Sequence, residues 1–179
     1  MHKPKRTLTS KVLTKNPWFQ VRQDEIQAQD ETKKRYYTIV SDPFVVICAL
    51  SEDRKGVTMV KNWRYPVQRY LWEFPMGWRE PNETPLMAAK RELLEETGLQ
   101  AKAWKSLGWF YLAPGISTQR GYIYVAQRLT RPGREKTSAE VVMSKEITVA
   151  KLRQLMQKKA VLDAPTHMAA SYLLAYLDR

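Results

Sequence analysis

Residues 77–99, GWREPNETPLMAAKRELLEETGL, carry the clearest structural signal in the chain. Thr84 suits a helix N-cap, Pro85 suits the first helical position, and Gly98 suits the residue after the last turn. Between them, apolar side chains recur at helical spacing. The stretch therefore predicts one helix between Thr84 and Gly98.

Three carboxylates lie close together on this helix. Glu92, Glu95 and Glu96 are three and four residues apart, so they project from one face. Each like-charge pair costs a helix about 0.2–0.5 kcal/mol. A hard divalent cation with oxygen ligands turns the same crowding into a binding site, and Mg²⁺ suits it best. The alternative is a solvated face on which Lys90 and Arg91 balance the carboxylates.

The same stretch resembles the Nudix box at every defined position. Nine positions across 23 residues match in type and spacing, which is far more specific than a lone glycine-rich motif. They are Gly77, Glu83, Arg91, Glu92, Leu93, Glu95, Glu96, Gly98 and Leu99. By this resemblance the chain is identified as a member of the Nudix pyrophosphohydrolases, which cut a nucleoside diphosphate linked to another group.

The resemblance implies a fold and a cofactor. The fold is α+β, a Nudix α/β/α sandwich with a mixed sheet. The cofactor is Mg²⁺ or Mn²⁺, with Glu92 and Glu96 as principal ligands, Glu95 assisting directly or through water, and the carbonyl of Met76 completing the shell. This agrees with the chemistry, because a diphosphate repels nucleophiles until cations neutralise its oxygens.

The resemblance also implies roles for residues around the carboxylates. Arg91 and Glu83 are expected to form an ion pair that fixes the loop against the helix. Glu140, in the sequence SAEVV, is expected on a loop as the carboxylate that orients or deprotonates the attacking water. Glu135 is the alternative for that role.

Residues outside the box resemble the ADP-ribose and ADP-sugar pyrophosphatases. Upstream, NWRYP (62–66) and WEFPMG (72–77) look like a segment of that branch in which the matching arginine, Arg64, holds the diphosphate with Glu73 beside the site. Downstream, Pro114 follows the end of the box by 15 residues, a placement associated with the same branch. Taken alone, Pro114 is equally a turn proline before glycine.

An N-terminal appendage is expected ahead of this domain. Trp18–Glu25 and Arg35–Val40 are predicted to pair as an antiparallel β-hairpin. In the resembled branch such a hairpin builds a homodimer in which each subunit helps to bind the nucleotide of the other. Trp18 and Tyr37 are candidates to stack on adenine, although an aromatic in an amphipathic strand is more often a core residue.

The remaining elements alternate between strands and helices, which favours the α+β class. Residues 1–42 are expected to form the appendage and residues 43–179 the Nudix domain. Predicted strands are Phe44–Leu50, Val57–Trp63, Ala101–Leu112, Gly121–Leu129 and a short one at Val141–Met143. Helical spacing predicts helices at Val149–Gln157 and Thr166–Leu177.

Composition limits the partners. The net charge of +12 attracts anions. The basic residues are scattered, however, so a nucleic-acid partner is not expected. The longest apolar stretches, such as Pro43–Leu50, fall far short of the roughly 20 residues of a membrane helix, so no membrane partner is expected. The basic N-terminus lacks the apolar run of a secretory signal, which favours a cytoplasmic location.

ADP-ribose hydrolysis to AMP and ribose 5-phosphate is the preferred function, and two alternatives stay open. One is the hydrolysis of GDP-mannose or another nucleotide sugar, since those pyrophosphatases share the architecture. The other is an RNA 5′-end-processing or RNA-binding Nudix protein, which the charge of +12 favours. The RNA alternative calls for a contiguous basic groove with exposed aromatics.

Overall fold

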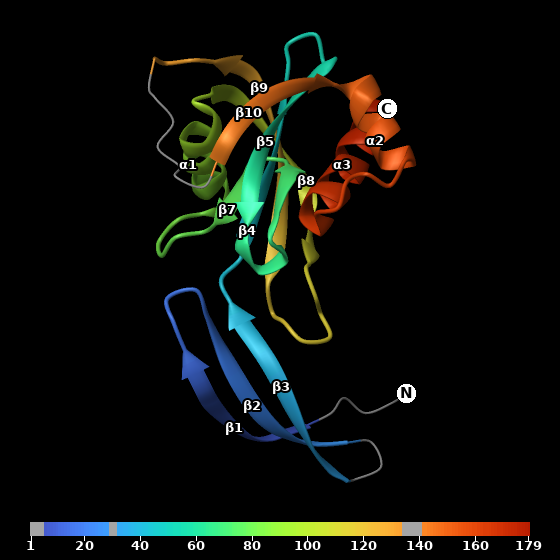
Figure 1. The fold of residues 1–179 in the computed structure, drawn as a ribbon. Helices are drawn as coiled ribbons and strands as arrows, with labels where there is room; N and C mark the ends of the chain where they lie inside the picture. Colours follow the sequence, from blue (N-terminus) through green and yellow to red (C-terminus); the bar gives the residue numbers. More distant parts are fainter. Residues whose placement is uncertain (1–5, 29–31, 134–140) are drawn as a thin grey trace. The chain divides into compact units, whose positions relative to one another are not determined.

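The computed structural model describes residues 6–28, 32–133 and 141–179 (Figure 1). The chain divides into a smaller unit, Met1–Asp42 with Tyr111–Arg120, and a larger unit, Pro43–Phe110 with Gly121–Arg179. Among the residues described, no helix is both long enough and apolar enough to cross a membrane.

The smaller unit is built on a three-stranded antiparallel sheet in the order β1 (Arg6–Lys15), β2 (Phe19–Gln27), β3 (Lys33–Ser41). The side chain of Asn16 accepts two backbone N–H groups at 2.9 Å and fixes the turn from β1 to β2. The predicted hairpin is present as β2 and β3. Strand β1 was not predicted, because it has no apolar alternation. All ten of its residues are exposed, so pairing with β2 rather than burial holds it in a strand.

In its described residues the larger unit contains a mixed sheet of seven strands. Strand β4 (Phe44–Leu50) pairs in parallel with β9 (Arg120–Thr130) and antiparallel with β5 (Gly56–Arg64), which also pairs antiparallel with β10 (Val141–Thr148). Two short strands extend the sheet, since β6 (Arg69–Glu73) pairs with β5 and β7 (Met76–Trp78) pairs with β4. In spatial order the main strands are β10, β5, β4, β9 and β8 (Gln100–Tyr111).

Helices cover both faces of this sheet, with α1 (Pro85–Thr97) on one side and α2 (Val149–Gln157) and α3 (Ala164–Leu177) on the other (Figure 1). Alternate residues of β4 enter two separate hydrophobic clusters. Val45 and Ile47 pack with Ala88, Ala89 and Leu93 of α1, and the intervening β4 side chains pack with α2 and α3. The predicted α/β/α sandwich is therefore confirmed. A 3-10 turn, η1, lies at Tyr65–Val67.

The ends of α1 are set by local sequence. The hydroxyl of Thr84 accepts from the N–H of Met87 at 3.2 Å, and Pro85 takes the first position. Gly98 has a φ of 68°, and its N–H donates to the carbonyl of Leu94 at 2.8 Å. Both predicted caps are confirmed, and they set where the helix that carries the box carboxylates begins and ends.

Candidate active site

The three clustered carboxylates occupy the second half of α1 and differ in burial. Glu96 is 5% exposed, and the side chains of Glu92 and Glu95 are 12% and 38% exposed. Burial raises the pKa of Glu92, and it raises the pKa of Glu96 to about 8, with the charge of Glu92 as the second cause. Buried, crowded carboxylates of this kind are stabilised by a cation.

Arg91 organises the carboxylates around it. Its guanidinium donates to Glu83 from Nε at 2.9 Å and from Nη2 at 3.0 Å. Nη1 donates to Glu92 at 2.7 Å and to Glu95 at 3.2 Å, and Nη2 also reaches the carbonyl of Trp78 at 2.8 Å. The hydrogen bonds from Arg91 lower the pKa of Glu83. The expected ion pair is thus present, and it ties the loop of the box to the helix.

The donor chemistry fits a hard divalent cation, because carboxylates and peptide carbonyls are the ligands that Mg²⁺ and Mn²⁺ prefer. The N–H of Met76 donates to Oε2 of Glu96 at 3.0 Å, which brings the backbone of Met76 beside this carboxylate. Within the described ranges, no three acidic, histidine or cysteine side chains already converge as ligands. Arg91 donates to Glu92 and Glu95 instead, so the side chains of the predicted ligands are neighbours that would have to turn in order to share one ion.

Arg64 and Glu73 form a second charged centre beside the carboxylates. Nε of Arg64 lies 2.9 and 3.1 Å from the two oxygens of Glu73, and Nη2 lies 2.6 Å from Oε2. Glu73 is fully buried and also accepts from Nδ2 of Asn62 at 3.0 Å. The charges of Arg64 and Glu73 act on the pKa of Glu96 in opposite directions, so this centre borders the buried end of α1.

Asn62 is a site residue that sequence reasoning missed. It is 1% exposed and sits in a strand that otherwise buries mainly apolar side chains. The available signal was a lone amide inside the predicted apolar strand Val57–Trp63, because a buried polar group calls for a specific partner.

The predicted nucleotide contacts belong to the smaller unit. Trp18 is 62% exposed and Tyr37 is 52% exposed, so the core alternative does not describe either residue within this unit. Pro114 lies in a loop closed by a hydrogen bond from the N–H of Ile116 to the carbonyl of Ala113 at 3.0 Å. The loop agrees with the turn that the sequence suggested there.

The two candidate bases, Glu140 and Glu135, lie outside the described residues. The described chain resumes at Val141, which pairs with Asn62 where β10 meets β5. The start of β10 is therefore anchored to the strand that carries both Asn62 and Arg64.

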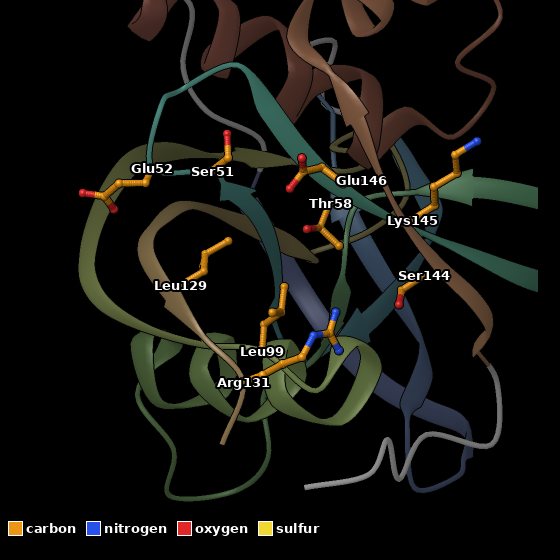
Figure 2. A pocket seen from close by; sticks show the side chains of 9 residues that line it. All are labelled: Ser51, Glu52, Thr58, Leu99, Leu129, Arg131, Ser144, Lys145 and Glu146. Carbon is orange, nitrogen blue, oxygen red and sulfur yellow. The ribbon is translucent and has the colours of Figure 1, made fainter. Parts of the chain in front are cut away.

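A cavity of about 360 Å³ lies elsewhere on the larger unit (Figure 2). Its lining includes Leu99, Arg131, Glu146 and the buried Thr58. Thr58 precedes Asn62 by four residues on β5, so the two side chains point to the same face of the sheet. At about 3.3 Å per residue, they are about 13 Å apart along the strand. The cavity is therefore separate from the Arg64 and Glu73 centre.

The fold and the box together define a Nudix hydrolase. The family model described as the NUDIX domain matches residues 42–170, and the chain belongs to this family. The resemblance of residues 77–99 to the Nudix box is confirmed as a family relationship.

Individual relatives place the chain near one branch of the family. It is 30% identical over 174 residues, 94% of each chain, to an ADP-ribose pyrophosphatase of Bacillus subtilis. It is 32% identical over 135 residues to an ADP-ribose pyrophosphatase of Mycobacterium tuberculosis, covering 75% of this chain and 65% of the relative. A crystal structure of an ADP compounds hydrolase superimposes with a TM-score of 0.88 at 20% identity, covering 99% of this chain and 96% of the other. At that identity the superposition shows a shared fold.

Proposed function

We propose that this Nudix hydrolase cuts the diphosphate of ADP-ribose to give AMP and ribose 5-phosphate, with Mg²⁺ or Mn²⁺ as cofactor. The observation that carries the proposal is the Arg64 and Glu73 ion pair beside the buried end of the carboxylate helix. The 30% identity to an ADP-ribose pyrophosphatase over 94% of the chain supports the choice of substrate.

Arg64 is the proposed anchor for the diphosphate. A guanidinium is planar and always charged, so it suits the oxygens of a diphosphate better than a point charge does. Glu73 orients Nε and Nη2 of Arg64, and the positive charge of Arg64 acts on Glu96. The guanidinium of Arg64 is proposed to hold the diphosphate, and the carboxylate of Glu96 is proposed to bind the cation that neutralises it.

The reaction itself is the displacement of one phosphate by water. A bond forms between the water oxygen and one phosphorus, the bond from that phosphorus to the bridging oxygen breaks, and the bridging oxygen leaves with the other phosphate. The proton of the water passes to a carboxylate, for which Glu140 is proposed and Glu135 is the alternative. A bound divalent cation supplies charge neutralisation of the diphosphate. Glu92, Glu95, Glu96 and the carbonyl of Met76 are the proposed holders of the cation.

The smaller unit is the proposed dimerisation and nucleotide-binding appendage. Its exposed aromatics, Trp18 and Tyr37, offer stacking surfaces for a base. Its strand β1 leaves Leu8, Val12 and Leu13 exposed, which a second copy of the chain would cover. Pro114 is proposed to shape the loop that contacts the substrate.

The test is a substrate panel at equal concentration: ADP-ribose, ADP-glucose, GDP-mannose, diadenosine polyphosphates and 5′-triphosphate RNA. ADP-ribose is expected to give the highest kcat/KM, with AMP and ribose 5-phosphate as products. A higher kcat/KM for GDP-mannose would keep the chemistry and reject the substrate. Cleavage of RNA alone, with binding that weakens steeply with salt, would reject the small-molecule proposal.

A further inference from the structure

Asn62 has an unequal set of hydrogen bonds. Its Nδ2 donates to Oε2 of Glu73 at 3.0 Å, whereas its Oδ1 is buried without a hydrogen-bond partner in the described part of the chain. Across the sheet it lies opposite Leu71 on β6 and Val141 on β10. The amide is thus set among strand neighbours that favour an apolar side chain.

Stability of the fold does not account for an asparagine here. A buried amide oxygen that gains no partner costs free energy, and that loss offsets what the Nδ2 bond contributes. Leucine has nearly the same size and shape and carries no such penalty. The hydrogen bond from Nδ2 to Glu73, and not packing within β5, therefore accounts for an amide at this position.

The bond to Asn62 determines how Glu73 is held. Arg64 makes three contacts to the two oxygens of Glu73, and Asn62 adds a fourth from a different side chain on the same strand. Each added donor to a carboxylate narrows the orientations open to it. The amide of Asn62 belongs to the sheet, so its hydrogen bond restrains Glu73 and, with it, the guanidinium that Glu73 contacts, as the outer partners of ligand side chains do in other sites.

We propose that Asn62 is a positioning residue that fixes the carboxylate of Glu73 and, through it, aims Arg64 at the diphosphate of a nucleoside diphosphate ligand. The inference rests on the diphosphate-binding role proposed for Arg64. In this role Asn62 contributes to ligand binding and does not contact the reacting atoms.

The experiment compares Asn62→Leu with the wild-type protein, using ADP as the probe in calorimetry with Mg²⁺. The Kd for ADP is expected to rise about tenfold, the effect of one lost charge-assisted hydrogen bond. For a cleaved substrate, KM should rise by a similar factor while kcat changes less. The Tm should stay within about 5 °C of wild type, because the stranded oxygen is removed with the donor.

A double-mutant cycle separates positioning from a general loss of structure. Arg64→Ala should weaken ADP binding more than Asn62→Leu does, and the double variant should bind no more weakly than Arg64→Ala alone. Thr58→Val is the matched control, since Thr58 is a buried polar residue on the same face of β5 outside this network. It should leave the Kd for ADP unchanged.

Each contrary outcome has a distinct meaning. Unchanged ADP affinity in Asn62→Leu, additive effects in the cycle, or failure of Asn62→Leu to fold would overturn the role of Asn62. Unchanged affinity in Arg64→Ala would instead overturn the proposed role of Arg64. If the substrate panel rejects ADP-ribose while ADP binding still depends on Asn62 through Arg64, the substrate is wrong and the positioning role stands.

Discussion

Gly77 lies against the carboxylate of Glu92 so closely that a Cβ at this position would be 2.0 Å from Oε1 and 2.4 Å from Oε2. Strand β7 and helix α1 approach this closely because glycine has no side chain. The obstructing atoms are the mobile end of a glutamate, so we expect Gly77→Ala to fold with Glu92 turned out of the site. Activity should fall about 10–100-fold and the Mg²⁺ requirement should rise, measured by kinetics across a Mg²⁺ titration.

Gly56→Ala is the matched control for that variant. A Cβ at Gly56 would lie 2.5 Å from Oε1 of Glu146, so it displaces a glutamate in the same way at a position outside the proposed site. Its activity should equal that of wild type. Equal losses in both variants would show that the effect is general and that Glu92 has no special role.

Arg91 is expected to be irreplaceable by lysine. A lysine keeps the charge, but one ammonium cannot serve Glu83, Glu92, Glu95 and the carbonyl of Trp78 together. Arg91→Lys should lose about 1–3 kcal/mol of stability in urea unfolding and should lower kcat. The reverse exchange at the exposed neighbour, Lys90→Arg, should change neither quantity. A fully active, fully stable Arg91→Lys variant would contradict the organising role of Arg91.

Glu96→Gln tests the proposed role of Glu96 as a principal metal ligand, because it removes a charge and almost no volume. Hydrolysis should collapse in Mg²⁺ and in Mn²⁺. Activity within about tenfold of wild type, roughly 1.4 kcal/mol of barrier, would remove Glu96 from the metal site. The exposed carboxylate of Glu52 gives the control, and Glu52→Gln should remain fully active.

The raised pKa of Glu96 predicts how the stability of the metal-free protein depends on pH. Burial and then the charge of Glu92 raise that pKa to about 8, from about 4.3 in an unfolded chain. Between these values the folded state holds a proton that the unfolded state has released, so stability is lost as the pH rises from about 4.5 to about 8. The pKa of Glu92 is raised as well, so Glu92 adds to the same loss, whereas the lowered pKa values of Glu83 and Asp24 give stability that is lost as the pH falls.

The measurement is Tm in EDTA from about pH 5.5 to pH 8.5, repeated with Mg²⁺. The Tm should fall in EDTA and fall less in Mg²⁺, since cation binding requires the ionised carboxylate and releases its proton. The decline should be smaller in Glu96→Gln, which has no proton to lose at that position. A Tm that rises with pH in EDTA would contradict the buried, protonated state of Glu96.

Local sequence was enough to predict α1 and the three carboxylates that cluster on it. Thr84 and Gly98 set the ends of the helix through bonds to residues three or four positions away, and the box spacing follows from that helix. Strands β6 and β7 were missed because each is short and owes its form to pairing with β5 or β4. Strand β10 is also longer than the predicted Val141–Met143, since its register with β5 continues to Thr148.

The charged partners of the site were only partly visible in sequence. The Arg91 and Glu83 pair follows from the box, whereas the place of Asn62 depends on the register of β5 with β6, which brings Val60 opposite Glu73. Such a register is set by long-range pairing and leaves no short motif. The roles proposed for Trp18 and Tyr37 depend in the same way on an assembly that one chain does not specify.

The last prediction is that the protein is a homodimer that uses the smaller unit. Among the described residues, strand β1 pairs only with β2. All residues of β1 are exposed, and three of them, Leu8, Val12 and Leu13, are large and apolar. Light scattering at micromolar concentration should give twice the chain mass of 20.9 kDa. Leu13→Lys should shift the mass toward one chain, because a charge on a buried contact is costly. Leu162→Lys, at a residue 66% exposed in the larger unit, should leave the dimer intact. A clean monomer mass for the wild-type chain would reject the dimer, and with it the proposal that Trp18 and Tyr37 reach a nucleotide bound by a second subunit.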